Sequence, residues 1–360
     1  MGKVVVLGAG VMGSALTVPA ADRGHEVILA TTPIDQQILA ALSADRGAHP
    51  KLGAPLADSI RVVDAGALTR ADVADADLVI VGVSSPGVEW AATEAVRLQP
   101  SAPMALVTKG LVPATDNSAP LTYADAFPAL LSAKGASGLG PLVGIGGPCI
   151  ARELAERRPT AVVYASADAG AAATAKSLLE TDYYRISLSG DVVGVEACAA
   201  LKNFFAIGVS SMMSRHTRHG DATKNPVAAA FQQAIDELAL LAPWLGGTRE
   251  SAFSLAGVGD LHVTVGGGRN SRLGRHLGEG LSIKAAMTGP LSGETVEGVD
   301  VGRVLGPPLK AAIAAGALPE ARLPLALALV NAALKGGPLH YDVSARSAAP
   351  EGAELEEAAS

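Results

Sequence analysis

The chain has 360 residues, of which 49% are apolar and only 3% aromatic, so it is long enough for two domains with cores built mainly from Ala, Val and Leu. Its 28 basic and 35 acidic side chains give a net charge of −7, which argues against a nucleic-acid-binding protein. Two cysteines without metal-ligand spacing, and apolar stretches shorter than the ~20 residues of a membrane span, predict a cytoplasmic protein with no metal site and no membrane insertion.

The first thirty residues have the order strand, glycine-rich turn, helix, strand. A β-branched run predicts a strand at 3–7, which leaves no room for a signal peptide before it. A helical pattern at 14–23 is closed by Gly24, and a second strand is expected at 26–30. This order is the one that a dinucleotide-binding fold requires.

The turn itself has the spacing G-x-G-x-x-G, formed by Gly8, Gly10, Val11, Met12 and Gly13. In such a turn Gly8 permits the tight bend, Gly10 lets the backbone approach a pyrophosphate, and Gly13 lets helix and strand pack closely. The amino terminus of the helix then faces the anion. The pattern therefore predicts binding of NAD or NADP at these five residues.

The choice between NAD and NADP is left open by the residues after the second strand. An acidic side chain usually holds the ribose hydroxyls there. Thr31, Thr32 and Pro33 occupy that place instead, with Asp35 beyond and no arginine to bind a 2′-phosphate. Two hydroxyls without a repelling carboxylate slightly favour NADP.

Further strands and helices alternate as far as residue 189. Strands are expected at 78–83, 104–108, 142–146, 160–165 and 183–188, and helices at 89–98, 150–157 and 170–179, while 112–140 is expected to be a loop or weak helices. Ligands of open parallel sheets lie at the carboxyl ends of the strands. Ser84–Pro86 and Lys109 follow two strands and are therefore expected at that edge, although an exposed strand-end lysine is the simpler interpretation of Lys109.

The strand signal nearly disappears after residue 189, so the predicted fold is a Rossmann-like α/β sheet domain at 1–189 followed by an all-helical substrate domain at 190–345. Helices are expected at 225–242, 298–315 and 323–334. Residues 346–360 carry several glutamates among small residues and are expected to be a disordered acidic tail.

Lys202 lies in the apolar stretch 192–207, where Glu196 and Asn203 are the only other polar side chains. Asp191 is a plausible N-cap for the helix that this stretch predicts. Burying a lysine costs several kcal/mol unless it is paired or its pKa falls. A lowered pKa suits a proton donor that works near neutral pH. The alternative is a surface lysine whose stem lies over apolar neighbours.

A second polar group follows in the helical half, where Asp260 stands in the run GVGDLHVT and Arg269 and Asn270 lie in a glycine-rich loop. Arginine suits phosphate because its planar fork donates paired hydrogen bonds. Asp260 is a candidate for holding Lys202 in place. Each of these residues also has a simpler interpretation, Asp260 as a turn residue and Arg269 as a surface residue.

These motifs together resemble one family, the NAD(P)-dependent sn-glycerol-3-phosphate dehydrogenases of the bacterial cytosolic type. The similar segments occur in family order from residue 8 to residue 299: GAGVMGSAL, TKG at 108–110, GGPCIARELAERRPTAVV at 146–163, GVEACAALKN at 194–203, GVGDLHVT at 257–264, RN at 269–270 and VEGV at 296–299.

The resemblance implies reversible reduction of dihydroxyacetone phosphate to sn-glycerol 3-phosphate by NAD(P)H, in support of phospholipid synthesis. Lys202 matches the family's catalytic lysine, and Lys109 and Asp260 match its polar partners. The remaining matches are to ligand contacts: Arg269 and Asn270 for the substrate phosphate, Arg269, Lys109, Glu297 and Ala151 for the cofactor, and Gly147 and Cys149 for the substrate side of the GP turn.

Three departures from the family pattern border the substrate positions: Cys149 and Gly268 stand where the family has serines, and 208–225 looks like a longer and more basic loop. They leave the substrate open. The same mechanism on another phosphorylated ketose or polyol phosphate is one alternative, and a 3-hydroxyacid or ketopantoate-type reductase is another. A non-catalytic nucleotide-binding protein is a third. The expected partners are a small phosphorylated substrate and a second copy of the chain in a homodimer.

Overall fold

The computed structural model describes residues 1–360 apart from 46–48, 117, 216, 218–223 and 346–360, so the predicted acidic tail lies outside the described residues. The chain divides into two compact units. The first unit contains Met1–Val112, Leu121–Ala200 and Ala242–His262, and the second contains Pro113–Pro120, Leu201–Leu241 and the chain from Val263 onward. The sequence placed a domain boundary at 189, whereas the units divide inside a helix that continues without interruption past Ala200.

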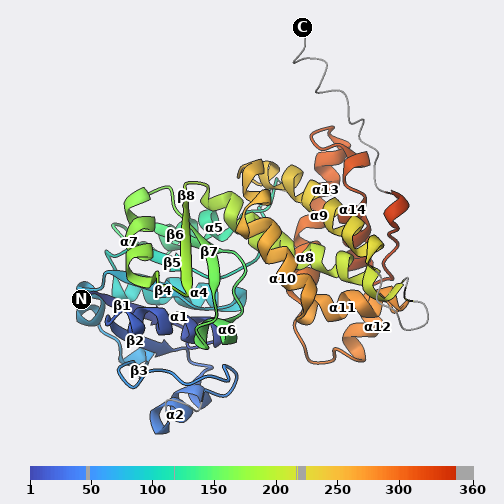
Figure 1. The fold of residues 1–360 in the computed structure, drawn as a ribbon. Coiled ribbons are helices and arrows are strands. Elements are labelled where there is room, and N and C mark those ends of the chain that lie inside the picture. The colour runs from blue at the N-terminus through green and yellow to red at the C-terminus, as the bar shows by residue number, and fades with distance from the viewer. Residues whose placement is uncertain (46–48, 117, 216, 218–223, 346–360) are drawn as a thin grey trace. The chain divides into compact units, whose positions relative to one another are not determined.

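The first unit is built on an eight-stranded sheet with the order β3-β2-β1-β4-β5-β6-β7-β8 (Figure 1). All neighbours are parallel except β6 and β7, which are antiparallel. The strands are β1 (Lys3–Leu7), β2 (Glu26–Thr31), β3 (Arg61–Asp64), β4 (Leu78–Val81), β5 (Met104–Leu106), β6 (Leu142–Gly146), β7 (Thr160–Ala165) and β8 (Tyr184–Ser189).

Helices bury both faces of this sheet, and β1 shows why. Successive side chains of a strand point to opposite faces. Val4 and Val6 lie in one apolar core with residues of α1, α2, α6 and α7, whereas Val5 and Leu7 lie in a second core with residues of α3, α4 and α5. The helices of this unit are α1 (Val11–Asp22), α2 (Gln36–Ala44), α3 (Arg70–Ala74), α4 (Val88–Leu98), α5 (Tyr123–Ala133), α6 (Ala151–Ala155) and α7 (Ala169–Leu179).

The strands expected at 3–7, 142–146 and 160–165 are confirmed with the same bounds. The structure also contains α2 and β3, which the sequence reading did not identify, and α5, where only a loop or weak helices were expected. Helix α5 forms because Tyr123, Phe127 and Leu131 recur every four residues and are all buried.

All regular elements of the described chain after Ser189 are helices or helical turns, which confirms the predicted all-helical half. They are α8 (Val192–Arg215), α9 (Asn225–Trp244), α10 (Asp260–Gly266), α11 (Arg269–Gly278), α12 (Ile283–Thr288), α13 (Glu297–Ala314) and α14 (Pro324–Lys335). Short turns connect elements of both units: the 3₁₀ turns η1 (Ala65–Ala67), η2 (Ser85–Gly87), η3 (Arg249–Phe253), η5 (Glu320–Arg322) and η6 (Val343–Ala345), and the π-helical turn η4 (Leu255–Gly259).

Helix α8 carries Lys202 and begins where the sequence predicted. The carboxylate of Asp191 accepts a hydrogen bond from the backbone N–H of Gly194 at 2.9 Å, which confirms the predicted N-cap. The helix continues to Arg215, so the expectation of a loop from residue 208 is wrong for 208–215. It is long and apolar enough to cross a membrane by length and composition, but 89% of its most apolar window is buried within the protein.

Candidate functional site

The glycine turn after β1 has the geometry that its spacing predicts. Gly8 has a φ of +110°, and a Cβ there would lie 2.9 Å from the carbonyl oxygen of Gly82. A Cβ on Gly13 would lie 2.1 Å from the carbonyl oxygen of Gly8, so α1 can pack against the turn only with glycine at that position. A Cβ on Gly10, in contrast, would meet only the carbonyl oxygen of Gly82, at 3.7 Å. The backbone at Gly10 is therefore open to the approach of a ligand, directly before the half-buried Val11 and Met12.

Two further segments lie at the carboxyl ends of β4 and β5. The hydroxyl of Thr108 donates to the carbonyl oxygen of Val83 at 2.7 Å, and that of Ser85 donates to the carbonyl oxygen of Lys109 at 3.1 Å. These bonds tie the two strand ends together. They also place Lys109 at the sheet edge where the sequence predicted a ligand.

Lys109 is not a simple exposed strand-end lysine. Its ammonium lies 3.0 Å from Oδ2 of Asp260, and the two side chains are 23% and 2% exposed respectively. Asp260 belongs to the same compact unit although it is far away in sequence. Burying a carboxylate is costly unless a cationic partner compensates for the lost hydration. The structure therefore brings together two of the three predicted catalytic residues.

Asp260 is held by an unusual backbone segment. It directly follows the π-helical turn η4 and is the first residue of α10. π-Helical turns are rare and are frequent at functional sites. A Cβ on Gly259 would lie 3.3 Å from Pro148, so the GP turn packs against the residue before Asp260.

The GP turn contains the predicted substrate-side residues. Gly147 has a φ of +114°, and a Cβ there would lie 3.0 Å from Cα of Val162, so the turn requires glycine. Cys149 is partly exposed. Ala151 begins α6, is 8% exposed and packs in the apolar core, which leaves only its backbone for contact with a cofactor.

The second unit contains the other predicted residues. Lys202 is 7% exposed within α8, which favours the buried lysine over one whose head group lies in solvent. Asn203 follows it and is 5% exposed. Its amide nitrogen donates to Oε2 of Glu297 at 3.0 Å, and its oxygen accepts from the amide of Asn270 at 3.1 Å. Asn203 thus joins two predicted ligand-binding residues, a role that the sequence reading missed.

The same network extends to Arg269 and the start of α13. A guanidinium nitrogen of Arg269 donates to Oε1 of Glu297 at 3.2 Å, and the amide oxygen of Asn270 accepts from the backbone N–H of Gly298 at 2.9 Å. A Cβ on Gly298 would lie 2.4 Å from the carbonyl oxygen of Asn203, so α13 and α8 are in close contact here. The predicted Arg-Asn pair and Glu297 therefore form one polar cluster with Asn203.

Gly268 departs from the family pattern, and its backbone conformation explains why glycine stands there. It precedes α11 with a φ of +90°, a region that side chains other than glycine rarely adopt. Arg269 and Asn270 were expected in a loop, but they are the first two residues of that helix. The first backbone N–H groups of a helix have no partner within the helix. Such a terminus attracts anions.

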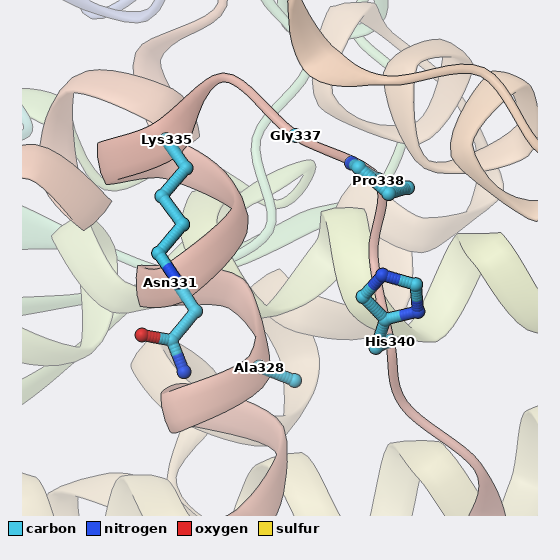
Figure 2. Close-up of a pocket in the computed structure, with 6 residues that line it drawn as sticks. All are labelled: Ala328, Asn331, Lys335, Gly337, Pro338 and His340. Atoms are coloured by element: carbon cyan, nitrogen blue, oxygen red, sulfur yellow. The ribbon is translucent and has the colours of Figure 1, made fainter.

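One cavity of the second unit lies apart from these residues. It has a volume of about 290 Å³ and is lined by Ala328, Asn331, Lys335, Gly337, Pro338 and His340. Figure 2 shows Asn331 and Lys335 on α14, with His340 on the chain that follows Pro338. None of the predicted site residues lines it. Within the described ranges, no three His, Cys, Asp or Glu side chains are grouped as metal ligands.

Comparison with known proteins gives consistent matches over most of the chain. Residues 3–172 match the amino-terminal domain of NAD-dependent glycerol-3-phosphate dehydrogenase, and residues 191–320 match its carboxy-terminal domain. An NADP(+)-dependent glycerol-3-phosphate dehydrogenase of Archaeoglobus fulgidus is 38% identical over 284 residues, which cover 79% of this chain and 82% of the relative. A glycerol-3-phosphate dehydrogenase [NAD(P)+] of Exiguobacterium is 30% identical over 99% of this chain and 98% of the relative.

The fold is also similar to solved structures of proteins named glycerol-3-phosphate dehydrogenase. The glycerol-3-phosphate dehydrogenase of Coxiella burnetii matches with a TM-score of 0.73 and 23% identity over 95% of this chain and 96% of that structure. That of Plasmodium falciparum matches with a TM-score of 0.77 and 17% identity over 95% of this chain and 93% of that structure.

Proposed function

The chain belongs to the NAD-dependent glycerol-3-phosphate dehydrogenase family, and from this premise we propose which of its residues carry the reaction. The protein is an NAD(P)-dependent oxidoreductase that interconverts dihydroxyacetone phosphate and sn-glycerol 3-phosphate. The observation that supports the assignment of roles is the burial of Lys202, which is 7% exposed at the position of the family's catalytic lysine.

Gly8, Gly10 and Gly13 fit the cofactor that the family uses. The open backbone at Gly10 and the amino terminus of α1 together suit a pyrophosphate. The other proposed contacts in the first unit are Val11, Met12, Lys109 and the backbone of Ala151. Arg269 and Glu297 are the proposed contacts in the second unit. When bound, the nicotinamide supplies or accepts the hydride.

Lys202 is the proposed general acid and base. Reduction of a ketone leaves charge on its oxygen, and a proton donor within hydrogen-bond reach stabilises that charge. Lys109 and Asp260 are the proposed polar partners of this step. Their ion pair supports the proposal because it holds the buried carboxylate of Asp260 in a defined position.

The substrate phosphate is assigned to Arg269 and Asn270. The backbone N–H groups at the start of α11 and the remaining donors of the Arg269 guanidinium suit a phosphate. Asn270 is held on both sides by Asn203 and Gly298, so its position is defined before the substrate binds. Gly147 and Cys149 are the proposed contacts to the rest of the substrate.

The test is the rate of NAD(P)H oxidation with dihydroxyacetone phosphate in the wild type and in Lys202→Ala. We expect kcat to fall by about 10²–10⁴-fold, the usual contribution of a positioned acid. Lys284→Ala changes an exposed lysine of the same unit and is the matched control, for which wild-type kcat is expected. Full activity of Lys202→Ala with a normal circular dichroism spectrum would overturn the assignment.

Cofactor preference, cellular location and oligomeric state are proposed from the same premise. We propose that NADP is preferred, because Thr31 and Thr32 replace an acid at the end of β2 and the Archaeoglobus relative is NADP(+)-dependent. A cytoplasmic homodimer is the proposed state of the protein. A panel of phosphorylated ketones, each assayed with NADH and NADPH, tests cofactor choice and whether Cys149 and Gly268 alter the substrate range.

A further inference from the structure

His49 lies beside the glycine turn and is 4% exposed. Its Nε2 atom lies 3.0 Å from the carbonyl oxygen of Ala9, the residue between Gly8 and Gly10. Its Nδ1 atom accepts hydrogen bonds from the backbone N–H groups of Lys51 at 3.2 Å and Leu52 at 3.1 Å. Both ring nitrogens are therefore used, and both face backbone atoms.

These contacts define the tautomer of the ring. Because Nδ1 accepts two N–H groups, it carries no proton, and the proton of the neutral ring lies on Nε2. The Nε2–H group then donates to the carbonyl oxygen of Ala9. The hydroxyl of Ser14 donates to the same oxygen at 3.1 Å. The Ala9 carbonyl thus has two donors, which satisfy both of its lone pairs.

Holding this carbonyl also fixes the next N–H group. The peptide bonds of the described chain are trans, so the C=O of Ala9 and the N–H of Gly10 point in opposite directions within one plane. With the oxygen turned towards His49 and Ser14, the Gly10 N–H points away from them. Gly10 borders this peptide and lacks a Cβ atom, so its φ angle alone would hinder rotation of the peptide only weakly.

We propose that His49 is a positioning residue for the cofactor: it holds the peptide between Ala9 and Gly10 in the orientation that presents the Gly10 N–H to the pyrophosphate. A turn that is already ordered loses less conformational entropy when the ligand binds. The inference rests on the proposed place of the cofactor at the glycine turn. It adds a side chain more than thirty positions further along the sequence, outside the glycine motif.

Two substitutions separate the functions of the two ring nitrogens. In His49→Asn the side-chain oxygen can still accept from the N–H groups of Lys51 and Leu52, but the shorter side chain no longer reaches the Ala9 carbonyl, which keeps only the Ser14 hydroxyl as a donor. In His49→Gln the amide N–H₂ lies near the original position of Nε2 and can still donate to Ala9. His25→Asn is the matched control, because His25 also accepts a backbone N–H at Nδ1, from Gly2 at 3.0 Å, at the opposite end of β1.

The measurement is the dissociation constant of NADPH and of NADH, from fluorescence titration without substrate. We expect His49→Asn to raise it about three- to ten-fold, the value of one hydrogen bond, and His49→Gln to restore most of the affinity. His25→Asn should match the wild type. The KM for dihydroxyacetone phosphate at saturating cofactor should change less than two-fold in His49→Asn, which distinguishes positioning of the cofactor from general damage.

Equal cofactor affinity of His49→Asn and wild type would overturn the inference and leave the proposed function intact. A wild type that binds neither cofactor would overturn both. If His49→Asn does not fold, Ser14→Ala removes the other donor to the Ala9 carbonyl. It should also raise the dissociation constant, and an unchanged value there would count against the inference.

Discussion

At the scale of single residues, Asp260 organises the ion pair with Lys109, and Asn203 organises the polar cluster that contains Arg269, Asn270 and Glu297. Asp260 is almost fully buried and remains paired to Lys109, while Asn203 bridges Asn270 and Glu297. Each of these two residues forms hydrogen bonds with side chains that are distant in the sequence, and these bonds orient the partner side chains. Geometry of this kind, with donors and acceptors matched one to one, is what holds a ligand group in a defined orientation.

The Asn203 bridge leads to a prediction about the phosphate-binding residues. Asn203→Asp removes the donor to Glu297 and places two carboxylates side by side, so Glu297 and Arg269 should lose their present arrangement. We expect the KM for dihydroxyacetone phosphate to rise about ten-fold, equivalent to one strong hydrogen bond. Steady-state kinetics measure it.

The control for this change is Asn331→Asp, the same substitution at an exposed position of α14 that no proposed ligand contacts. Its KM should equal that of the wild type. If Asn203→Asp behaves like Asn331→Asp, the polar cluster around Glu297 has no part in substrate binding.

At the scale of the elements, the start of α8 is held by the side chain of Asp191. Besides capping α8 through Gly194, the carboxylate of Asp191 accepts from the backbone N–H of Thr248 at 2.9 Å, from its hydroxyl at 2.7 Å and from the hydroxyl of Ser251 at 2.6 Å. One side chain therefore ties the start of α8 to the segment that leads into the π-helical turn and Asp260. Burial alone would raise the pKa of Asp191, but the hydrogen bonds from Ser251, Thr248 and Gly194 outweigh it and lower the pKa.

We expect Asp191→Ala to lower the free energy of unfolding by about 2 kcal/mol, the upper end for an N-cap. Since the folded-state pKa of Asp191 is lowered, its contribution is present above its ordinary value of 3.8 and disappears as the pH falls through the folded value. The difference between wild type and variant should therefore shrink below about pH 3.8. Urea unfolding at several pH values measures both effects.

Asp168 supplies the comparison, because it caps α7 through the N–H of Ala171 at 3.0 Å. Asp168→Ala should cost less than Asp191→Ala, since Asp191 makes three further hydrogen bonds. An equal loss in the two variants would mean that the bonds to Thr248 and Ser251 add nothing to stability.

At the scale of the whole molecule, each compact unit contains one deeply buried glutamate among the residues that the structure describes. Burial raises the pKa of Glu196 in the first unit and of Glu237 in the second to about 8, although both accept backbone hydrogen bonds. Glu237 accepts from the N–H groups of Leu325 and Ala326 at 2.7 and 2.6 Å, at the start of α14. Glu196 accepts from the N–H of Ala124 at 2.5 Å, near the start of α5.

These raised values predict how stability depends on pH. A carboxyl group with a raised folded-state pKa contributes stability below its unfolded value of 4.5, and this contribution is lost as the pH rises to about 8. The free energy of unfolding should therefore fall across this range, by at most about 1.4 kcal/mol per pH unit for each group. Glu237→Gln and Glu196→Gln should each flatten the profile, as measured by denaturant unfolding from pH 5 to pH 9. Profiles parallel to that of the wild type would contradict the assignment.

Much of this architecture follows from local pattern. The β-branched run at 3–7, the glycine spacing after it and the Asp191 cap each contain their own signal, because backbone conformation and capping depend on adjacent residues. The amphipathic spacing of Tyr123, Phe127 and Leu131 was present as well, but the small residues and prolines around it masked the helix. Residues 208–215 were misread as a loop because polar residues there are buried by packing, as the 0% exposure of Ser210 and Ser211 shows.

The chemistry of single residues, in contrast, depended on contacts between distant segments. Sequence reading, helped by family resemblance, selected Lys109, Asp260, Arg269 and Asn270, but it offered no way to see that Lys109 pairs with Asp260 or that Asn203 joins Asn270 to Glu297. Local pattern reflects backbone preferences over a few neighbouring residues, whereas an ion pair or a bridging amide exists only when folding brings together side chains that are far apart along the chain. His49 shows the same distinction: nothing next to it in the sequence indicates that its ring reaches the carbonyl of Ala9.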